Sequence, residues 1–513
     1  MSSDSGRTTS IWMETVVPVF PPLAANTQAD VCVIGAGIAG LSTAFLLARS
    51  GKSVIVLEDG RIGGGETGRT TAHLTTALDD RYYELEHLHG SLGAQLAAES
   101  HAAAIDQIEA IVVQEGIDCE FERVDGYLFG ASEDAIDLLT RELAAAQRAG
   151  LSGVALLPRG SISALGQSSC LKFPRQAQFH PLKYLNGLAR LIQRMGGVIC
   201  TQTHAASIQD GAPVRVMTSS GLEVQAGAVV IATNAPINDR IAISAKQAAY
   251  RTYVIGVEVP KGSVPTALYW DTLDPYHYIR LANAADPGNR TTELLIVGGE
   301  DHKTGQADDE QARFARLETW TREHFPMSLS VQYRWSGQVL EPIDGLAYIG
   351  LSPGEQSSIF IATGDSGNGM THGTIAGMLL TDLILGRENP WTKLYNPSRV
   401  TLRAAKEFIE EGLNTAAQLT DWVTPGMVNT PDEVAAGTGA IMGYGLAKVA
   451  VFRDENNRVH EYAAECPHLG CIVDWNTLER TWDCPCHGSR FDAYGKVING
   501  PANSDLKPRE PKA

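Results

Sequence analysis

The chain has little positive charge, no long apolar run and few cysteines outside one short stretch. It carries 41 lysine and arginine residues against 59 aspartate and glutamate residues, a net charge of −18. Nucleic acids and anionic membrane surfaces are bound through basic patches, so this balance argues against both as partners. No segment reaches the roughly 18 uninterrupted apolar residues of a spanning helix, and the first thirty residues show no signal peptide. We therefore expect a cytoplasmic protein without a membrane span.

The cysteines are distributed unevenly. Four of the eight lie between positions 466 and 486, whereas Cys32, Cys119, Cys170 and Cys200 are scattered through segments expected to be strands or core. Scattered single cysteines are typical of a reducing compartment. The length of 513 residues predicts two or three domains.

Two boxes near the C-terminus, Cys-Pro-His-Leu-Gly-Cys at 466–471 and Cys-Pro-Cys-His-Gly-Ser at 484–489, contain metal-ligand residue types at specific spacings. In a Rieske [2Fe-2S] centre two thiolates hold one iron and two imidazoles hold the other, which requires paired Cys-x-His and Cys-x-x-His loops. Cys466, His468, Cys484 and His487 match those positions. Tetrahedral zinc is the competing interpretation, but it leaves the second cysteine of each box without a role. We expect iron-sulfur.

The surrounding residues resemble the Rieske proteins of respiratory and photosynthetic chains, through Gly488-Ser489, Arg490-Phe491-Asp492, Gly495 and Gly500-Pro501-Ala502. This resemblance implies a disulfide between Cys471 and Cys486 and a proline-containing loop that shields the cluster. Ser489 matches the serine that hydrogen-bonds a cluster sulfur, whereas Phe491 replaces the usual tyrosine. Hydrogen bonds to the sulfurs raise the potential, so we predict a value below the top of the Rieske range of about −150 to +300 mV.

The N-terminal part begins with a dinucleotide-binding pattern. An apolar strand at 30–34 leads into Gly-Ala-Gly-Ile-Ala-Gly at 35–40, a helix follows to about residue 50, and a second strand at 53–57 ends in Glu58. Gly35 permits the tight turn, Gly37 lets the backbone approach a pyrophosphate, and Gly40 lets the helix pack closely. Glu58 is placed to bind a ribose hydroxyl.

Three further segments carry a family resemblance: a glycine- and threonine-rich loop at 62–73, an apolar strand at 228–234, and a strand at 359–364 that leads into Gly-Asn-Gly-Met-Thr at 367–371. With these, residues 28–390 resemble the D-amino-acid oxidase or glycine oxidase class of FAD oxidoreductases. The whole chain resembles bacterial DadA-like FAD oxidoreductases with a fused Rieske domain. The resemblance implies FAD as a cofactor beside the [2Fe-2S] cluster.

The resemblance also implies cofactor contacts for particular residues. Thr67, Thr70 and Thr71 would contact the pyrophosphate or flavin, Ala205 the adenine, and the turn that includes Gly369, Met370 and Thr371 the flavin ring. Ile38 and Ala39 belong to the pyrophosphate loop. His73 lies near a position where some related dehydrogenases attach flavin covalently, but the spacing differs by a residue, and we expect it to pack non-covalently.

The predicted fold class is α/β: a Rossmann-like FAD-binding domain with an inserted antiparallel substrate sheet, followed by an all-β Rieske domain. We place the FAD-dependent domain at 28–390 with the inserted sheet at about 245–335, a helical linker at 391–423, and the Rieske domain at 424–513. Helical periodicity predicts helices over 81–114 and 135–148, and a charged helix over 397–419.

The two cofactors together suggest the chemistry. FAD exchanges two electrons with an organic substrate, whereas a [2Fe-2S] cluster exchanges one at a time. We expect substrate to reduce the flavin, which passes electrons singly to the cluster and on to an external one-electron acceptor, so that a dehydrogenase is favoured over an oxygen-using oxidase. Two alternatives stay open: reverse flow from a ferredoxin-like donor, and a non-enzymatic redox sensor or electron-transfer protein.

The family resemblance implies an amine or amino acid as substrate, oxidised to an imine at the carbon that bears nitrogen. A carboxylate would favour an arginine fork and an amine an aromatic wall. The candidates for orienting it are Tyr253, Tyr276, His277, Arg280 and Arg334, together with Arg251, Tyr278 and Trp335.

Overall fold

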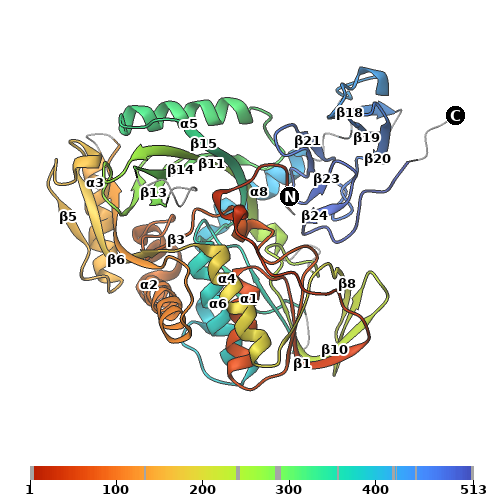
Figure 1. Cartoon of the computed structure of the whole chain (residues 1–513), viewed down its shortest axis with the longest axis horizontal. Helices are drawn as coiled ribbons and strands as arrows, with labels where there is room; N and C mark the ends of the chain where they lie inside the picture. The colour runs from red at the N-terminus through yellow and green to blue at the C-terminus, as the bar shows by residue number, and fades with distance from the viewer. Residues whose placement is uncertain are drawn as a thin grey trace.

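The structure is a computed structural model and describes residues 5–131, 135–238, 243–283, 291–354, 358–418, 422, 425–444 and 447–509. Two large sheets form the first three quarters of the chain, and two small sheets form a separate C-terminal unit (Figure 1). The predicted boundary at 423/424 and the chain end at 510–513 lie outside the described residues. The predicted fold class is confirmed.

The first sheet has eight strands in the order β16-β17-β10-β1-β2-β7, with β9 and β8 continuing antiparallel from β10. β1 pairs in parallel with both β2 and β10, as expected of a dinucleotide-binding fold. The strands are β1 (Thr27–Ile34), β2 (Val54–Leu57), β7 (Val198–Cys200), β8 (Ala205–Gln209), β9 (Val214–Thr218), β10 (Glu223–Ile231), β16 (Tyr348–Leu351) and β17 (Ile359–Thr363).

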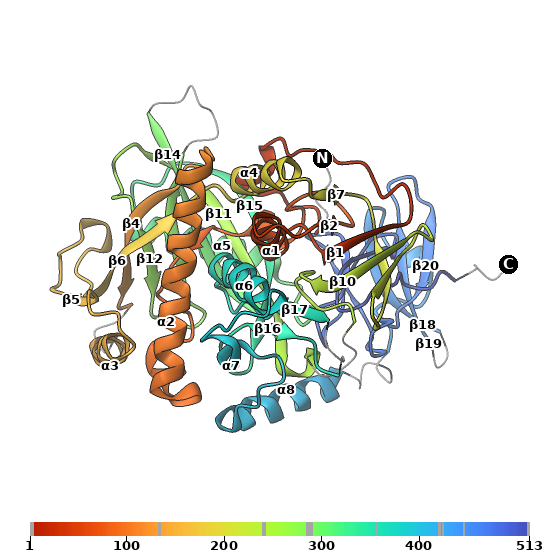
Figure 2. The ribbon, with the colours of Figure 1, turned by 90° about the horizontal axis from the view of Figure 1, so that it is seen from below.

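Helices cover one face of this sheet. Figure 2 shows α1 (Ile38–Arg49), α6 (Gly369–Ile384) and the long α2 (Tyr82–Glu115) side by side, and α4 (Pro181–Arg194) packs on α1. Buried apolar residues of β1, β2 and these helices form one continuous core. α6 begins at Gly369, so its first turn includes Gly369 and Met370.

The second sheet has nine strands in the order β15-β11-β14-β13-β12-β4-β6-β3, with β5 beside β6. It combines strands from two separate stretches of chain and is therefore not a single insertion at 245–335. The strands are β3 (His73–Leu74), β4 (Glu122–Phe129), β5 (Ala155–Leu157), β6 (Cys170–Gln178), β11 (Gln247–Pro260), β12 (Leu268–Asp271), β13 (Tyr278–Ala282), β14 (Thr292–Lys303) and β15 (Val331–Pro342). α5 (Glu310–His324) packs across β11 and β14, and α3 (Ala135–Arg148) packs on α2 and β5.

The C-terminal unit contains a three-stranded and a four-stranded antiparallel sheet, which share a main core, and a smaller apolar cluster lies on the three-stranded sheet. The core includes the paired tryptophans Trp475 and Trp482, whose ring centroids are 4.8 Å apart. The strands are β18 (Thr438–Tyr444), β19 (Ala447–Arg453), β20 (Val459–Ala463), β21 (Asp474–Asn476), β22 (Thr481–Asp483), β23 (Arg490–Asp492) and β24 (Val497–Asn499).

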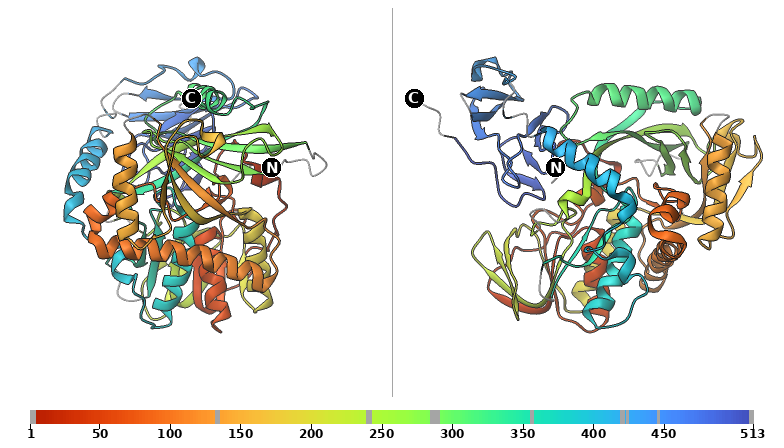
Figure 3. Two further views of the ribbon diagram at one scale, coloured as in Figure 1. Left: turned by 90° about the vertical axis from the view of Figure 1, so that its left-hand side faces the viewer. Right: turned by 180° about the vertical axis from the view of Figure 1, so that it is seen from behind.

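The connection between the two parts contains α7 (Thr392–Tyr395) and α8 (Ala405–Gln418). The predicted helix over 397–419 starts only at Ala405, after a short 3-10 turn at Leu402–Ala404, and its predicted last residue lies outside the described residues. Before that turn, Arg399 is anchored to Asp344 by an ion pair of 2.6 Å. We call the two large sheets and their helices the flavin-type part. The right-hand view of Figure 3 shows α8 extending along this part toward the C-terminal unit.

Candidate active site and cluster centre

The turn between β1 and α1 presents bare backbone. Gly35 has a φ of +103°, and a Cβ at this residue would lie 2.4 Å from the carbonyl oxygen of Ala232. A Cβ on Gly40 would lie 1.9 Å from the carbonyl oxygen of Gly35, so α1 packs directly on the turn. At Gly37 the nearest atom to a Cβ would be Thr67 Oγ1, at 3.1 Å. A helix N-terminus exposed in this way binds phosphate groups through its N–H groups.

This turn opens on a cavity of about 1030 Å³, lined by both large sheets and by the C-terminal unit. Small-molecule sites have volumes of about 300 to 1,000 Å³, so the cavity is large enough for an extended cofactor. Most predicted cofactor residues line it: Gly35, Gly37, Ile38, Ala39, Glu58, Thr67, Thr70, Thr71, Ala205, Gly369 and Met370.

Gly40 and Thr371 do not line the cavity. Gly40 supports the turn, and the Thr371 hydroxyl lies 2.8 Å from His101 Nδ1 behind the first turn of α6. Glu58 is fixed at the end of β2, where its carboxylate accepts hydrogen bonds from the N–H groups of Ala36, at 2.6 Å, and Gly60, at 3.0 Å. A bare phosphate-binding turn and a strand-end carboxylate in one cavity fit the diphosphate and ribose of FAD.

His73 lines the cavity on its second-sheet side. Its Nδ1 lies 2.9 Å from the Thr71 hydroxyl and its Nε2 lies 3.2 Å from the Ile279 carbonyl oxygen. Burial lowers the pKa of His73 to about 3. A neutral ring with both nitrogens in hydrogen bonds agrees with the prediction of non-covalent packing, which stays a prediction.

Four carboxyl groups line the cavity where β14, β15 and the segment after β17 meet: Asp79, Asp301, Glu341 and Asp365. The Tyr276 hydroxyl donates to Asp79 Oδ2 over 2.6 Å. Burial raises the pKa of Asp79 to about 6 and the pKa values of Asp301 and Asp365 to about 7. Burial also raises the pKa of Glu341. We call these four carboxyls, with Trp270, Tyr276 and Tyr278 beside them, the acidic end of the cavity.

Sequence reasoning missed the four carboxyls because they come from four distant segments. Asp365 lies between the strand predicted at 359–364 and the Gly-Asn-Gly-Met-Thr motif at 367–371, and that motif points to the flavin ring and not to a carboxylate. Asp301 stands in the polar last third of β14, and Glu341 lies near the end of β15, a strand of mixed polar and apolar residues, so no local feature identifies them.

Of the five principal substrate candidates, Tyr276 alone lines the cavity. The Tyr253 hydroxyl contacts His302 Nε2 at 2.9 Å, and His277 pairs with Asp271 at 2.7 Å. Arg280 is buried and donates to backbone carbonyl oxygens, among them that of Ala72 at 2.9 Å. Arg334 is half exposed on the outer surface and pairs with Glu318 at 2.8 Å.

Of the three further candidates, Tyr278 also lines the cavity, and its hydroxyl lies 2.5 Å from that of Thr252. Trp335 is fully buried and donates from Nε1 to the Arg69 carbonyl oxygen over 2.8 Å. Arg251 is fully buried at the contact with the C-terminal unit, where it pairs with Glu479 at 3.2 Å.

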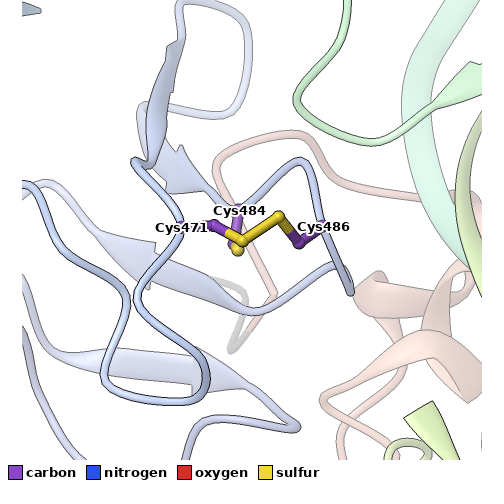
Figure 4. A group of neighbouring side chains, drawn as sticks. All are labelled: Cys471, Cys484 and Cys486. Carbon is purple, nitrogen blue, oxygen red and sulfur yellow. A yellow bond between two sulfur atoms is a disulfide. The ribbon is translucent and has the colours of Figure 1, made fainter. Parts of the chain in front are cut away.

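The loops 466–471 and 484–489 face each other in the C-terminal unit and are joined by a disulfide between Cys471 and Cys486 (Figure 4). The sulfur of Cys484 lies with the two disulfide sulfurs in a group within 4.8 Å. Because the disulfide occupies the other two sulfurs, Cys484 is the thiol of this group that can bind iron. The pairing implied by the Rieske resemblance is thus present.

The predicted cluster ligands lie together. Cys466 and Cys484 are buried, and the rings of His468 and His487 have centroids 5.1 Å apart. A hydrogen bond from the Cys484 thiol lowers the pKa of Cys466, and N–H groups of His468 and Leu469 and the Ser489 hydroxyl act in the same direction. Two adjacent thiols and two adjacent imidazoles are the donor set of a Rieske cluster.

A second layer holds these loops. The Ser489 hydroxyl, fully buried, accepts a hydrogen bond from the N–H of Ala502 over 3.0 Å, so the proline-containing loop closes over the box. Phe491 is fully buried on β23. These outer groups orient metal ligands and tune a cluster.

The second box also docks on the flavin-type part. Gln338 donates from Nε2 to the Gly488 carbonyl oxygen over 3.0 Å, and Gln306 donates to the Pro485 carbonyl oxygen over 3.1 Å. A Cβ on Gly488 would lie 2.3 Å from the Cβ of Ala249. Gln338 also lines the cavity. One side chain therefore contacts both the cluster box and the cofactor cavity.

A buried charge network joins the two parts around Glu479, in the turn between β21 and β22. Its carboxylate lies 3.2 Å from Nη1 of Arg69 and 3.2 Å from Nη2 of Arg251. The N-terminal clasp, Ser5–Thr8, inserts at the same place: the Thr8 N–H donates to Glu479 over 2.8 Å and Arg490 donates to the Ser5 carbonyl oxygen over 2.8 Å.

Comparison with known families assigns both parts. The FAD dependent oxidoreductase family profile matches residues 30–383, and the Rieske [2Fe-2S] domain profile matches residues 424–509. The chain belongs to the FAD dependent oxidoreductase family and carries a C-terminal Rieske domain. Its cofactors are FAD and a [2Fe-2S] cluster, which resolves the choice between iron-sulfur and zinc.

Individual proteins agree with this assignment. YhfW of Bacillus subtilis (strain 168), named as a Rieske 2Fe-2S iron-sulfur protein, is 33% identical over 96% of both chains. The gamma-glutamylputrescine oxidoreductase of Escherichia coli (strain K12) is 26% identical over 72% of this chain and 86% of its own. Glycine oxidase from Geobacillus kaustophilus shares the fold, with a TM-score of 0.61 and 19% identity over 73% of this chain and 99% of its own. Within the described part of the chain, no helix is both long and apolar enough to cross a membrane.

Proposed function

We propose that this protein is a dehydrogenase of an amine or amino acid that passes electrons from reduced FAD one at a time to its Rieske cluster and on to an external acceptor. The substrate loses a hydride equivalent from the carbon that bears nitrogen, and water hydrolyses the resulting imine. Bound FAD would supply two-electron oxidation, and a bound cluster would supply one-electron transfer. The names of the E. coli relative and of the glycine oxidase support a nitrogen-bearing substrate.

The contact between the cluster box and the cavity is the observation that carries this proposal. The Gln338 side chain donates to the Gly488 carbonyl oxygen, and Gln338 lines the cavity. The backbone N–H of Gln338 donates to Glu66 Oε2 over 2.7 Å. The cluster loop thus packs against the wall of the flavin site. This position of the Rieske domain supports electron transfer between a bound flavin and the cluster.

We assign Cys466, His468, Cys484 and His487 as cluster ligands. We also retain the proposed limits of 28–390 for the FAD-dependent domain, 391–423 for the linker and 424–513 for the Rieske domain. In the cavity, the half-buried Tyr276–Asp79 pair is placed to hold a proton released by the substrate nitrogen. The glycine turn and Thr67 would hold the diphosphate of FAD.

Anaerobic reduction with a panel of amines and amino acids tests the proposal, with flavin absorbance and the Rieske EPR signal followed in parallel. A substrate should bleach the flavin and then produce the EPR signal. In His487→Ala, flavin bleaching should persist, whereas the EPR signal and the reduction of a one-electron acceptor should be lost. Rapid peroxide formation without cluster reduction would refute the proposal. Flavin reduction by a ferredoxin-like donor alone would favour reverse flow, and a wholly inert flavin would favour a redox sensor.

A further inference from the structure

The acidic end of the cavity has a one-sided charge. Among the described lining residues, the lysine and arginine side chains are Arg7, Arg69, Arg480 and Lys496, which come from the N-terminal segment, the loop after β2 and the Rieske domain. The four carboxyls come instead from the segment before α2, from β14 and β15, and from the segment after β17. The cationic side chains of the described lining therefore lie toward the Rieske domain, together with carboxylates such as Glu479 and Asp492, whereas the side chains beside Tyr276 are acidic.

Two arginines approach the acidic end from outside the cavity, but both are engaged elsewhere. Arg313 pairs with Asp309 at 2.7 Å and donates to the Glu300 carbonyl oxygen over 2.7 Å. Arg81 donates to the carbonyl oxygens of Leu78 and Asp271, both over 3.3 Å. Neither lines the cavity. The carboxyls thus depend on a cavity occupant for direct neutralisation.

Two carboxyl oxygens at the acidic end are unused within the described part of the chain. Asp301 Oδ1 and Asp365 Oδ1 are shielded from solvent and have no hydrogen-bond partner there. Hydrogen-bonding capacity left open on a buried charged group is costly. A ligand with N–H donors would satisfy both oxygens.

The walls beside these oxygens are aromatic and fixed. Tyr276 is held by Asp79 and Tyr278 by Thr252. The Tyr276 and Tyr278 rings have centroids 5.6 Å apart, and Trp270 lines the cavity near them. Aromatic faces attract ammonium groups, and most strongly where water is excluded.

We propose that the acidic end binds an aliphatic di- or polyamine that has no carboxylate. This inference rests on the proposed function and narrows its substrate class. One ammonium group would contact Asp301 or Asp365, and the other would remain within reach of Asp79 and Glu341. An amino acid would instead bring its carboxylate against like charges, and none of the described residues at the acidic end is a cation that could receive it.

Three four-carbon compounds test this on the FAD- and cluster-loaded protein: 1,4-diaminobutane, butylamine and 4-aminobutanoate. They share one chain length and differ in charge at the second end. By isothermal titration calorimetry, the diamine should bind about tenfold more tightly than butylamine, since a partly buried charge pair contributes about a factor of ten. 4-Aminobutanoate should bind more weakly than both. Equal or tighter binding of 4-aminobutanoate, or of butylamine, would overturn the proposal.

Variants locate the site. Asp301→Asn removes a charge at constant shape and should weaken diamine binding about tenfold. Asp125→Asn, a half-exposed aspartate that pairs with Lys172 at 2.6 Å, is the matched control and should bind the diamine normally. Equal affinities of the two variants would contradict the assignment of Asp301.

Flavin bleaching by the same compounds separates this inference from the proposed function. Tight diamine binding with no bleaching by the diamine or any other amine would refute the proposed oxidation and leave the recognition intact. Bleaching by 4-aminobutanoate or α-amino acids, with no diamine binding, would support the oxidation and overturn the substrate class inferred here.

Discussion

Glu479→Gln is the substitution that tests most directly what holds the Rieske domain on the flavin domain. Burial alone would raise the pKa of Glu479, but the charges of Arg69, Arg251 and Arg490 outweigh it and lower the pKa from 4.5 to about 2. A pKa shift of one unit corresponds to about 1.4 kcal/mol, so the lowered pKa of Glu479 corresponds to about 3 kcal/mol of stabilisation. Removing one partner of a buried ion pair costs about 3–5 kcal/mol, which agrees in magnitude.

The sign of this contribution follows from the lowered pKa. The stabilisation is fully present above pH 4.5, the ordinary value for glutamate, and is lost as the pH falls toward about 2. Glutamine keeps the shape of the side chain but not its charge. At pH 7 the free energy of unfolding of the variant should therefore be about 3 kcal/mol lower than that of the wild type. Near pH 2 the two free energies should be about equal.

Denaturant unfolding at pH 7 checks this prediction, with flavin fluorescence reporting on one domain and visible circular dichroism of the cluster on the other. We expect the cluster transition of Glu479→Gln to move to lower denaturant and to separate from the flavin transition. Glu455→Gln is the control, because Glu455 is a 66% exposed carboxylate that pairs with Arg480 in the same domain; an exposed pair is worth about 0–1 kcal/mol. A Glu479→Gln midpoint that coincides with that of Glu455→Gln would refute the reasoning.

Three further predictions concern the two sites. Cys471→Ser removes a disulfide with a sequence separation of 15 and should lower the stability of the cluster loops by about 3 kcal/mol. The Rieske EPR signal should then be lost at a lower denaturant concentration, and an unchanged midpoint would contradict the prediction. Asp301 and Asp365, with pKa values of about 7 against an ordinary 3.8, should bind diamines less tightly at pH 6 than at pH 8. The same two groups should make the unliganded protein less stable as the pH rises from about 4 to 7, and thermal melts with and without 1,4-diaminobutane check both signs. Phe491→Tyr adds a hydroxyl donor beside the cluster boxes and should raise the reduction potential by on the order of tens of millivolts, and an EPR redox titration that shows no rise would contradict it.

The cofactor-binding turn and the cluster boxes were predictable because their chemistry is local. Gly40 is required by its contact with the Gly35 carbonyl oxygen in the same turn, Gly35 adopts a positive φ there, and Cys484 and His487 are spaced by one loop. The disulfide was implied by resemblance and is present. Motifs of this kind need no knowledge of which strand pairs with which.

The acidic end was not predictable because it depends on pairing between distant segments. Asp79 precedes α2, whereas Asp301 lies in β14, which pairs with β11 and β13. Arg334 illustrates the opposite error: it was a substrate candidate by residue type, but it alternates along β15 with the buried Trp335 and faces outward. Residue type along a strand does not specify which face of the sheet a side chain lies on, and a shift of one residue exchanges the two faces.

The N-terminal clasp has a consequence for the order of events during synthesis. The Thr8 N–H and its acceptor on Glu479 are 471 positions apart, and Ser5 contacts Arg490 across 485 positions. At translation rates of about 5–20 residues per second, Glu479 is synthesised roughly 25 to 95 seconds after Thr8. The flavin domain can fold in that interval, whereas Ser5 and Thr8 can reach their native contacts only after Glu479 and Arg490 have been made.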